Sequence, residues 1–422
     1  GSLGEDKVLR GIAEAQVDIT SQKDTYKIST QNTKIRNIEY GSAGQKPFKQ
    51  SEVSLAGDAL LNTTEKQYAV KARMFSDAIE VDLDLANVSK DGQSLLKGKA
   101  DLEYDAAAVG DIVSGYLSQD VKLEGKRTTS VEFASRYPAD DPNKLLANLS
   151  TNKCTFGFDK ADYRGLSLGP ADVNAQFDKG LLTIDPFTTS ANGGQIFLAA
   201  NADFTGSSPV ISIPQAVSVK NLQIDEKLSY EFRGILAYLN PMFNDVIGLG
   251  GRLNFSAEKL LIPLDSKRRN DMQILATLGM DNLTIKPTES SGLFGTLLSL
   301  IGLGGDRALA TVRPTKFVVK DGFVRYDNMQ IDIGSTPINF KGTVGLDKRL
   351  DMQVSVPIGG RLAETLGGAV SLPLTGTIDN PVLDKSKLGE NLLQNTLKGL
   401  LDKDGKGLLD KETKDLLDGL LK

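Results

Sequence analysis

Apolar and polar residues alternate through residues 313–383. Two runs show the pattern most clearly: Met329, Ile331 and Ile333, and then Met352, Val354 and Val356. A period of two places successive side chains on opposite faces of a sheet. The pattern therefore predicts antiparallel strands with one apolar and one polar face. The dipeptide Asp321-Gly322 between two such runs is a strong signal for a two-residue hairpin turn.

Similar patterns occur upstream of this stretch. Alternation or β-rich composition predicts strands over 19–28, 34–40, 52–59, 67–75 and 78–85, and a further meander between residues 160 and 204. Polar, Gly-containing turns separate these runs, among them Lys90-Asp91-Gly92 and Asp178-Lys179-Gly180. The sequence therefore predicts a mainly β protein.

A strand, a short helix, glycines and a second strand follow one another in three places. These copies occupy residues 100–133, 217–261 and 349–378, with helices predicted over 106–117, 225–243 and 361–366. In the middle copy, Asp225 is a suitable N-cap and Pro241 ends or kinks the helix. One face of that helix carries apolar residues at helical spacing: Leu228, Phe232, Ile235, Leu236 and Leu239. The recurrence predicts strand-rich blocks joined by short crossover helices.

Composition shifts suggest where these blocks begin and end. We predict an N-terminal β block at 1–145, a middle β block at 146–262 with its crossover helix at 225–243, and a C-terminal β block at 263–384. The polar, Pro-containing segment 138–152 is the best candidate linker. Residues 385–422 form a Leu-rich tail whose spacing predicts two amphipathic helices.

A nearly uncharged, Gly-flanked segment at 290–303 interrupts the strand rhythm. Its apolar residues Phe294, Leu297 and Leu298 suit either a core-capping helix or ordered lid, or a segment that dips into lipid or covers a ligand groove. At this length it is too short to span a bilayer. The tail likewise suits either packing on the end of the sheet or docking to a membrane surface or a protein partner. Its polar face mixes Asp and Lys, which is unlike a basic membrane-binding helix.

Composition narrows the function classes. The chain has no histidine, which removes Ser-His-Asp and Cys-His catalysis and His-based zinc sites. Its only cysteine, Cys154, lies in an alternating apolar context and suits a small core position. A net charge of −5 without a basic stripe argues against nucleic-acid binding. We find no motif for a metal or a cofactor and predict a protein that is not an enzyme.

The stretch described first also carries a family resemblance. The run GFVRYDNMQIDIGSTPINFKGTVGLDKRLDMQVSVPIGG at 322–360, followed by LPLTGTIDNP at 372–381, resembles the C-terminal region of AsmA-like proteins. The similarity is clearest over 313–383, and the blocks at 155–262 look like weaker copies of the same plan. The Leu-rich tail is not part of it.

The resemblance implies an elongated, curved antiparallel sheet or groove, related to repeating β-groove proteins that transfer lipid between membranes. It implies a periplasmic location, an anchor in the inner membrane through an N-terminal helix that precedes this chain, and a role in outer-membrane lipid homeostasis or biogenesis. The implied partners are the envelope membrane and a phospholipid or another acyl-chain lipid. The family offers no catalytic residues to transfer to this sequence.

Three hypotheses follow for the function. The first is a protein that holds or conducts acyl chains on an apolar sheet face, with Phe294, Leu297 and Leu298 as a lid. The alternative for each lining residue is an ordinary core position. The lining candidates are Met329, Ile331, Ile333, Ile338, Phe340, Met352, Val354 and Val356. The second is a scaffold that docks partners through sheet edges or the C-terminal helices. The third, a carbohydrate-active enzyme, needs two paired carboxylates in a cleft, which the sequence does not indicate.

Overall fold

The computed structural model describes residues 7–42, 48–117, 121–206, 208–287, 292–301, 308–357 and 369–386. The protein is mainly β, with large antiparallel sheets, and this part of the predicted fold is confirmed. It divides into two compact units. Unit 1 comprises residues 1–217 with 263–265, and unit 2 comprises 218–262 with 266–422. Segment 138–152, the candidate linker, lies within unit 1, where it contributes a short helix and a strand.

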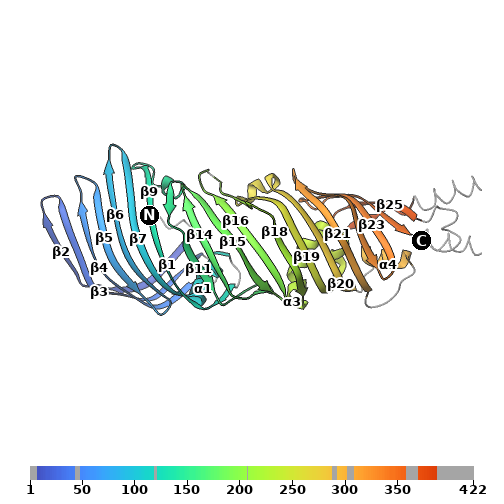
Figure 1. Ribbon diagram of the computed structural model, residues 1–422, viewed down its shortest axis with the longest axis horizontal. Coiled ribbons are helices and arrows are strands. Elements are labelled where there is room, and N and C mark those ends of the chain that lie inside the picture. The colour runs from blue at the N-terminus through green and yellow to red at the C-terminus, as the bar shows by residue number, and fades with distance from the viewer. Residues whose placement is uncertain are drawn as a thin grey trace, which may run out of the picture. The chain divides into compact units, whose positions relative to one another are not determined.

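Unit 1 begins with a nine-stranded antiparallel sheet in the order β1-β3-β4-β5-β6-β7-β9-β10, and β2 also pairs with β3 (Figure 1). Its strands are β1 (Lys7–Glu14), β2 (Val17–Gln22), β3 (Thr25–Ser42), β4 (Phe48–Asn62), β5 (Gln67–Phe75), β6 (Ile79–Lys90), β7 (Gln93–Asp105), β9 (Lys126–Pro138) and β10 (Leu149–Thr151). The prediction of one strand over 19–28 is wrong. A turn at Lys23-Asp24 separates β2 from β3, and Lys23 has a φ of 54°.

The first predicted crossover helix is present as α1 (Ala106–Leu117). It follows β7 and contacts β7, β3 and β4. In a flat sheet, β3 would lie four strand spacings from β7, or about 19 Å. A helix of 12 residues is about 18 Å long, so α1 can reach both places across the sheet.

The remaining strands of unit 1 form a second antiparallel arrangement. Cys154 is buried at the start of β11, as predicted. The predicted turn at Lys179-Gly180 is confirmed, and a second turn lies at Asn192-Gly193; all four residues have positive φ. The elements are β8 (Val121–Glu124), α2 (Lys144–Ala147), β11 (Cys154–Phe158), β12 (Lys160–Tyr163), β13 (Leu166–Leu168), β14 (Ala171–Asp178), β15 (Leu181–Ala191), β16 (Gly194–Asp203) and β17 (Val210–Ser212).

Unit 2 is a meander in which each strand pairs with the next along the chain. The predicted hairpin turn is confirmed, because Asp321 and Gly322 have positive φ and join two of these strands directly. The strands are β18 (Val217–Ile224), β19 (Val246–Pro263), β20 (Gln273–Pro287), β21 (Ala308–Lys320), β22 (Phe323–Ile333), β23 (Thr336–Gly345), β24 (Leu350–Pro357), β25 (Ala369–Gly376) and β26 (Pro381–Leu383).

The helices of unit 2 are α3 (Glu226–Leu239), η1 (Pro241–Asp245), η2 (Ser266–Asp271) and α4 (Leu293–Leu300). The side chain of Asp225 caps α3 as predicted, with its Oδ1 accepting from the Leu228 backbone N–H at 2.8 Å. The predicted apolar face is wrong at Ile235, which is 61% exposed. The predicted helix at 361–366 and the tail helices at 387–422 lie outside the described residues.

Candidate functional site

The nine-stranded sheet of unit 1 has one continuous apolar face that its own strands leave partly open. On β5 and β6, Val70 lies opposite Leu85, Ala72 opposite Leu83, and Met74 opposite Val81. The strand register places Ala100 and Leu102 of β7, and Val131 and Phe133 of β9, on the same face. We define the apolar face by ten half-buried residues on these four strands: Val70, Ala72, Met74, Val81, Leu83, Leu85, Ala100, Leu102, Val131 and Phe133.

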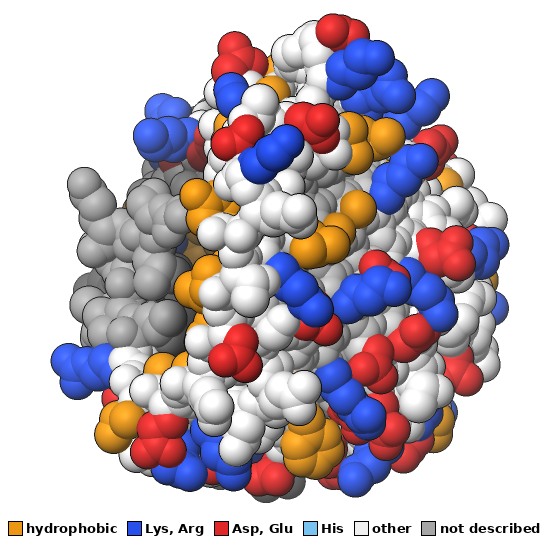
Figure 2. All heavy atoms as spheres, turned by 90° about the vertical axis from the view of Figure 1, so that its left-hand side faces the viewer, with side chains coloured by type: hydrophobic (Ala, Val, Ile, Leu, Met, Phe, Trp, Pro, Cys, Tyr) orange, Lys and Arg blue, Asp and Glu red, His pale blue; other side chains and the backbone are white. Residues whose placement is uncertain are grey.

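Exposed apolar side chains continue to the free edge of the sheet. All six residues of β2 are exposed, and Ile19 is 64% exposed. Ile19 pairs with Ile28 of β3, which pairs in turn with Ala59 of β4. Figure 2 views the molecule from the end where β2 lies and shows hydrophobic side chains among acidic and basic ones. An edge strand with unpaired backbone groups and exposed β-branched residues is a place where another strand can pair.

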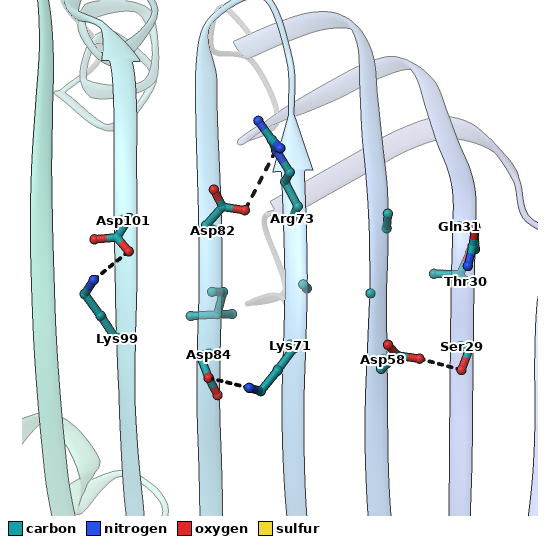
Figure 3. Close-up of a pocket in the computed structure, with 14 residues that line it drawn as sticks. Ser29, Thr30, Gln31, Asp58, Lys71, Arg73, Asp82, Asp84, Lys99 and Asp101 are labelled. Atoms are coloured by element: carbon teal, nitrogen blue, oxygen red, sulfur yellow. Dashed lines mark hydrogen bonds and ion pairs between the residues drawn. The ribbon is translucent and has the colours of Figure 1, made fainter.

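The opposite face of the same sheet is charged. Asp58, Lys71, Asp84, Lys99 and Glu132 lie on five successive strands in direct register, so positive and negative groups alternate across the sheet. Lys71 Nζ lies 3.1 Å from Asp84 Oδ2. Asp58, Lys71, Asp84 and Lys99 line an open depression of about 470 Å³, and Figure 3 shows the paired groups pointing toward one another.

Ion pairing accounts for the protonation behaviour of this charged face. Lys99 Nζ lies 2.8 Å from Asp101 Oδ2 and donates a hydrogen bond to it, which lowers the pKa of Asp101 and raises that of Lys99. Arg73 pairs with Glu80, which raises the pKa of the guanidinium. Because these groups are exposed, water and salt screen the pairs and each contributes little to stability. The alternating charges keep this face solvated and give the sheet a defined polar side.

The eight lining candidates predicted from the sequence lie in unit 2, on the corresponding apolar face of β22, β23 and β24. The structure brings them together there, and all are between 0 and 3% exposed. Helical elements pack against this sheet: α3 contacts β23, and α4 contacts β26 and η1. Asn240, between α3 and η1, lies 3.7 Å from Met329, measured from Nδ2 to Sδ. In the described structure these candidates therefore contact other protein groups.

The predicted lid segment forms α4. Its residues Phe294, Leu297 and Leu298 are buried. The carboxylate of Asp245 accepts from the Leu293 N–H at 2.6 Å, which fixes the start of α4 against η1. A side chain at Gly292 would collide with that carboxylate. This contact explains why glycine precedes the helix.

The apolar face of unit 1 was not among the predicted sites, although its signal was present in the sequence. Residues 67–105 alternate as regularly as residues 323–356, but only short turns join their strands. No connection between β5 and β7 is long enough to form a covering helix. In unit 2, by contrast, the chain between β18 and β19 contains α3 and η1, and the chain between β20 and β21 contains α4. The connection after β7 does contain a helix, α1, which contacts β7, β3 and β4, so connection length is only one difference between the two sheet faces.

Tyr326 has the one buried phenol of the unit 2 core for which the described residues supply no hydrogen-bond partner. Burial raises the pKa of this phenol far above its ordinary range. A buried, unpaired hydroxyl costs about 1–3 kcal/mol. We therefore expect Tyr326→Phe to raise the free energy of unfolding by about 1 kcal/mol, measured by urea denaturation. Tyr163→Phe, on a partly exposed side chain, is the control; a lower midpoint for Tyr326→Phe would show that the hydroxyl has a partner.

No group of three or more metal-ligating side chains occurs in the parts of the chain that the structure describes. None of the helices in those ranges combines the length and apolar character that a membrane crossing requires. Comparisons with protein families, with curated proteins and with solved structures found no match.

Proposed function

We propose that this chain is a non-enzymatic protein of the bacterial envelope that binds or conducts lipid acyl chains on an apolar β-sheet face. The observation that supports this most directly is the partly open apolar face of unit 1. The resemblance over 313–383 to AsmA-like proteins supports the periplasmic location, the membrane anchor and the role in outer-membrane lipid homeostasis.

The size and chemistry of the apolar face suit an acyl chain. Its residues occupy four adjacent strands, a width of about 14 Å. None of the ten side chains is charged, whereas the other face of the same strands carries the ion pairs. Binding a hydrocarbon chain needs no acid, base or metal, because each buried methylene contributes about 0.8 kcal/mol. The face therefore offers binding free energy without offering a reacting group.

The predicted lining residues of unit 2 remain a second candidate location for lipid. They would become available only if α3, η1 and α4 moved away from β22, β23 and β24. The face of unit 1 requires no such movement of unit 2 helices. We therefore assign the acyl-binding role to unit 1.

Placing the same polar residue on either face of β6 tests this assignment. We expect Leu83→Asn to lower uptake of a fluorescent phospholipid by the delipidated 422-residue chain about tenfold, because an amide desolvated against an acyl chain costs about 1–3 kcal/mol. Asp82→Asn is the matched control. Residue 82 is the adjacent position on the charged face, so its substitution should leave uptake within about twofold.

Size-exclusion chromatography with fluorescence detection measures the lipid that co-elutes with the folded protein. Circular dichroism of both variants confirms that the strands are retained. Equal uptake by the two variants would contradict the assignment to unit 1. No uptake by the unsubstituted chain would contradict the proposed function itself.

A scaffold that docks a protein partner is the second candidate function. The edge strand β2, whose residues are all exposed, favours it, because β-augmentation uses unpaired backbone groups of this kind. Gln22 and Thr25 flank a two-residue turn and form a hydrogen-bonded pair, so the N–H of Ser21 points away from β3. Replacing Ser21 by Pro would remove this N–H donor at the edge. Loss of a partner in pull-downs, with lipid uptake unchanged, would favour the scaffold over the lipid-binding role.

A further inference from the structure

A small polar cluster interrupts the apolar face of unit 1 near the end of β6. Asn87 follows Leu85 by two residues and therefore lies on the same face. Tyr68 of β5 is directly opposite Asn87. One step further along the strands, Ser89, Ser94 and Tyr137 lie in register on β6, β7 and β9. The polar cluster thus lies at the end of the apolar face and not on the opposite, charged face of the sheet.

Three residues of this cluster are buried more deeply than the apolar residues beside it, whereas Ser89 is half-buried and Tyr68 is 36% exposed. Asn87 and Ser94 are each 5% exposed and Tyr137 is 8% exposed, whereas Leu85 and Leu96 are only half-buried. Buried polar groups in proteins are nearly always hydrogen-bonded. The partners of these side chains therefore need to be accounted for.

The amide of Asn87 is the group whose hydrogen bonds are incomplete. The hydroxyls of Ser89 and Ser94 bond to each other at 2.7 Å. Asn87 Nδ2 reaches Ser89 Oγ only at 3.5 Å. Asn87 Oδ1 is buried and has no donor among the described residues. Exchanging the oxygen and nitrogen of the amide would leave the nitrogen unpaired instead. In either orientation, a hydroxyl group could complete the bonds, because it both donates and accepts.

The surroundings disfavour a charged ligand group. None of the five residues of the cluster is charged, and the Lys and Asp side chains of these strands point to the opposite face. Burial, followed by the neighbouring Tyr137, raises the pKa of Tyr68, so an anion is disfavoured here. A carboxylate or a phosphate placed in the cluster would lose its hydration without gaining a counter-charge.

We propose that Asn87, with Ser89 and Ser94, binds the neutral hydroxyl group of an acyl lipid whose hydrocarbon chain lies on the apolar face. The ligand class is a monoacylglycerol, a diacylglycerol or a fatty alcohol rather than a free fatty acid. This inference rests on the acyl-binding role proposed above and specifies which polar end that site prefers.

Competition between ligands that share one hydrocarbon chain tests the proposal. The probes are monopalmitoylglycerol, methyl palmitate and palmitate, each displacing a fluorescent acyl probe from the full chain. We expect the unsubstituted protein to bind monopalmitoylglycerol about tenfold more tightly than methyl palmitate. Asn87→Leu should remove that preference and leave affinity for methyl palmitate within about twofold. Asn32→Leu, at an exposed side chain, should retain it.

The possible results separate the two proposals. If the unsubstituted chain binds none of the probes, the acyl-binding function fails. If it binds all three with palmitate tightest, or if Asn87→Leu keeps the preference for the hydroxyl, the assignment to Asn87 is overturned while acyl binding stands. Thermal unfolding shows whether Asn87→Leu is folded. If it is not, Asn87→Ala carries the same expectation, since it removes the amide without adding volume.

Discussion

Phe340→Ala is expected to destabilise unit 2 by about 3–5 kcal/mol and to leave lipid uptake by the folded protein unchanged. Phe340 is 0% exposed and pairs with Met329 on one side and Val354 on the other. Removing a fully buried aromatic ring loses its transfer free energy and leaves a cavity that the surrounding core fills only in part. If Phe340 instead lined an acyl site, the same substitution would alter lipid uptake.

The stability of each unit must be measured separately, because a chain with two compact units need not unfold in a single step. Hydrogen exchange of peptides from β22–β24 across a urea series reports on unit 2. Peptides from β5–β7 report on unit 1 in the same samples and should not change. Phe323→Ala is the matched control: its ring is 37% exposed at the start of β22, so a loss of less than about 1 kcal/mol is expected.

A different outcome would place the lipid site in unit 2. If Phe340→Ala lost less than about 1 kcal/mol and lowered lipid uptake several-fold, the residues predicted from the sequence would be the acyl-lining surface. The same pair of measurements therefore decides between a covered core and a lipid groove in unit 2, and it does so independently of any substitution in unit 1.

The elements of this protein were predictable where a local signal was strong. Helix α1 occupies the predicted 106–117, because an Ala-rich segment follows Asp105, whose side chain accepts from the Ala107 N–H at 2.9 Å. The Asp225 cap and the turn at Asp321-Gly322 were predictable for the same reason. The strand predicted over 19–28 failed because Lys23 adopts a positive φ that its residue type rarely takes.

What covers each sheet face was harder to predict. Alternation shows that a sheet face is apolar but not whether other protein groups cover it. Leu83 and Val354 both lie in alternating runs, yet Leu83 is half-buried and Val354 is 0% exposed. The difference depends on whether a helix distant in sequence packs on that face. The role proposed for Asn87 could not be recognised from the sequence either. A single polar residue in an apolar run resembles a tolerated exception, and its incomplete hydrogen bonding is visible only once Ser89, Ser94 and Tyr137 are placed around it.

Gly342→Ala is expected to cost unit 2 at least about 3 kcal/mol. Gly342 has a φ of 127°, a region that residues with a Cβ rarely occupy, so the backbone itself would be strained. An added Cβ would also lie 2.7 Å from the Met352 Cα on β24 and closer still to the Asp351 carbonyl oxygen. Both contacts are with backbone of a paired strand, so neither can be relieved by a change of rotamer. Strain and overpacking of this kind each cost about 1–3 kcal/mol.

Substitutions at two further glycines distinguish backbone strain from steric collision as the cause of this loss. Gly334 has a φ of 59° and nothing within 4 Å of an added Cβ, so Gly334→Ala reports backbone strain alone and should cost about 1 kcal/mol. Gly279 has no positive φ, and its added Cβ would meet Pro314 at an ordinary 3.5 Å, so Gly279→Ala should be nearly neutral. Urea midpoints of the three variants, followed through hydrogen exchange of β23 and β24, give the comparison. If Gly342→Ala lost no more than Gly334→Ala, β23 and β24 would have to separate at this point. The pairing of Gly342 with Met352, which holds β23 against β24 beside Val354, would then not be a fixed part of the fold.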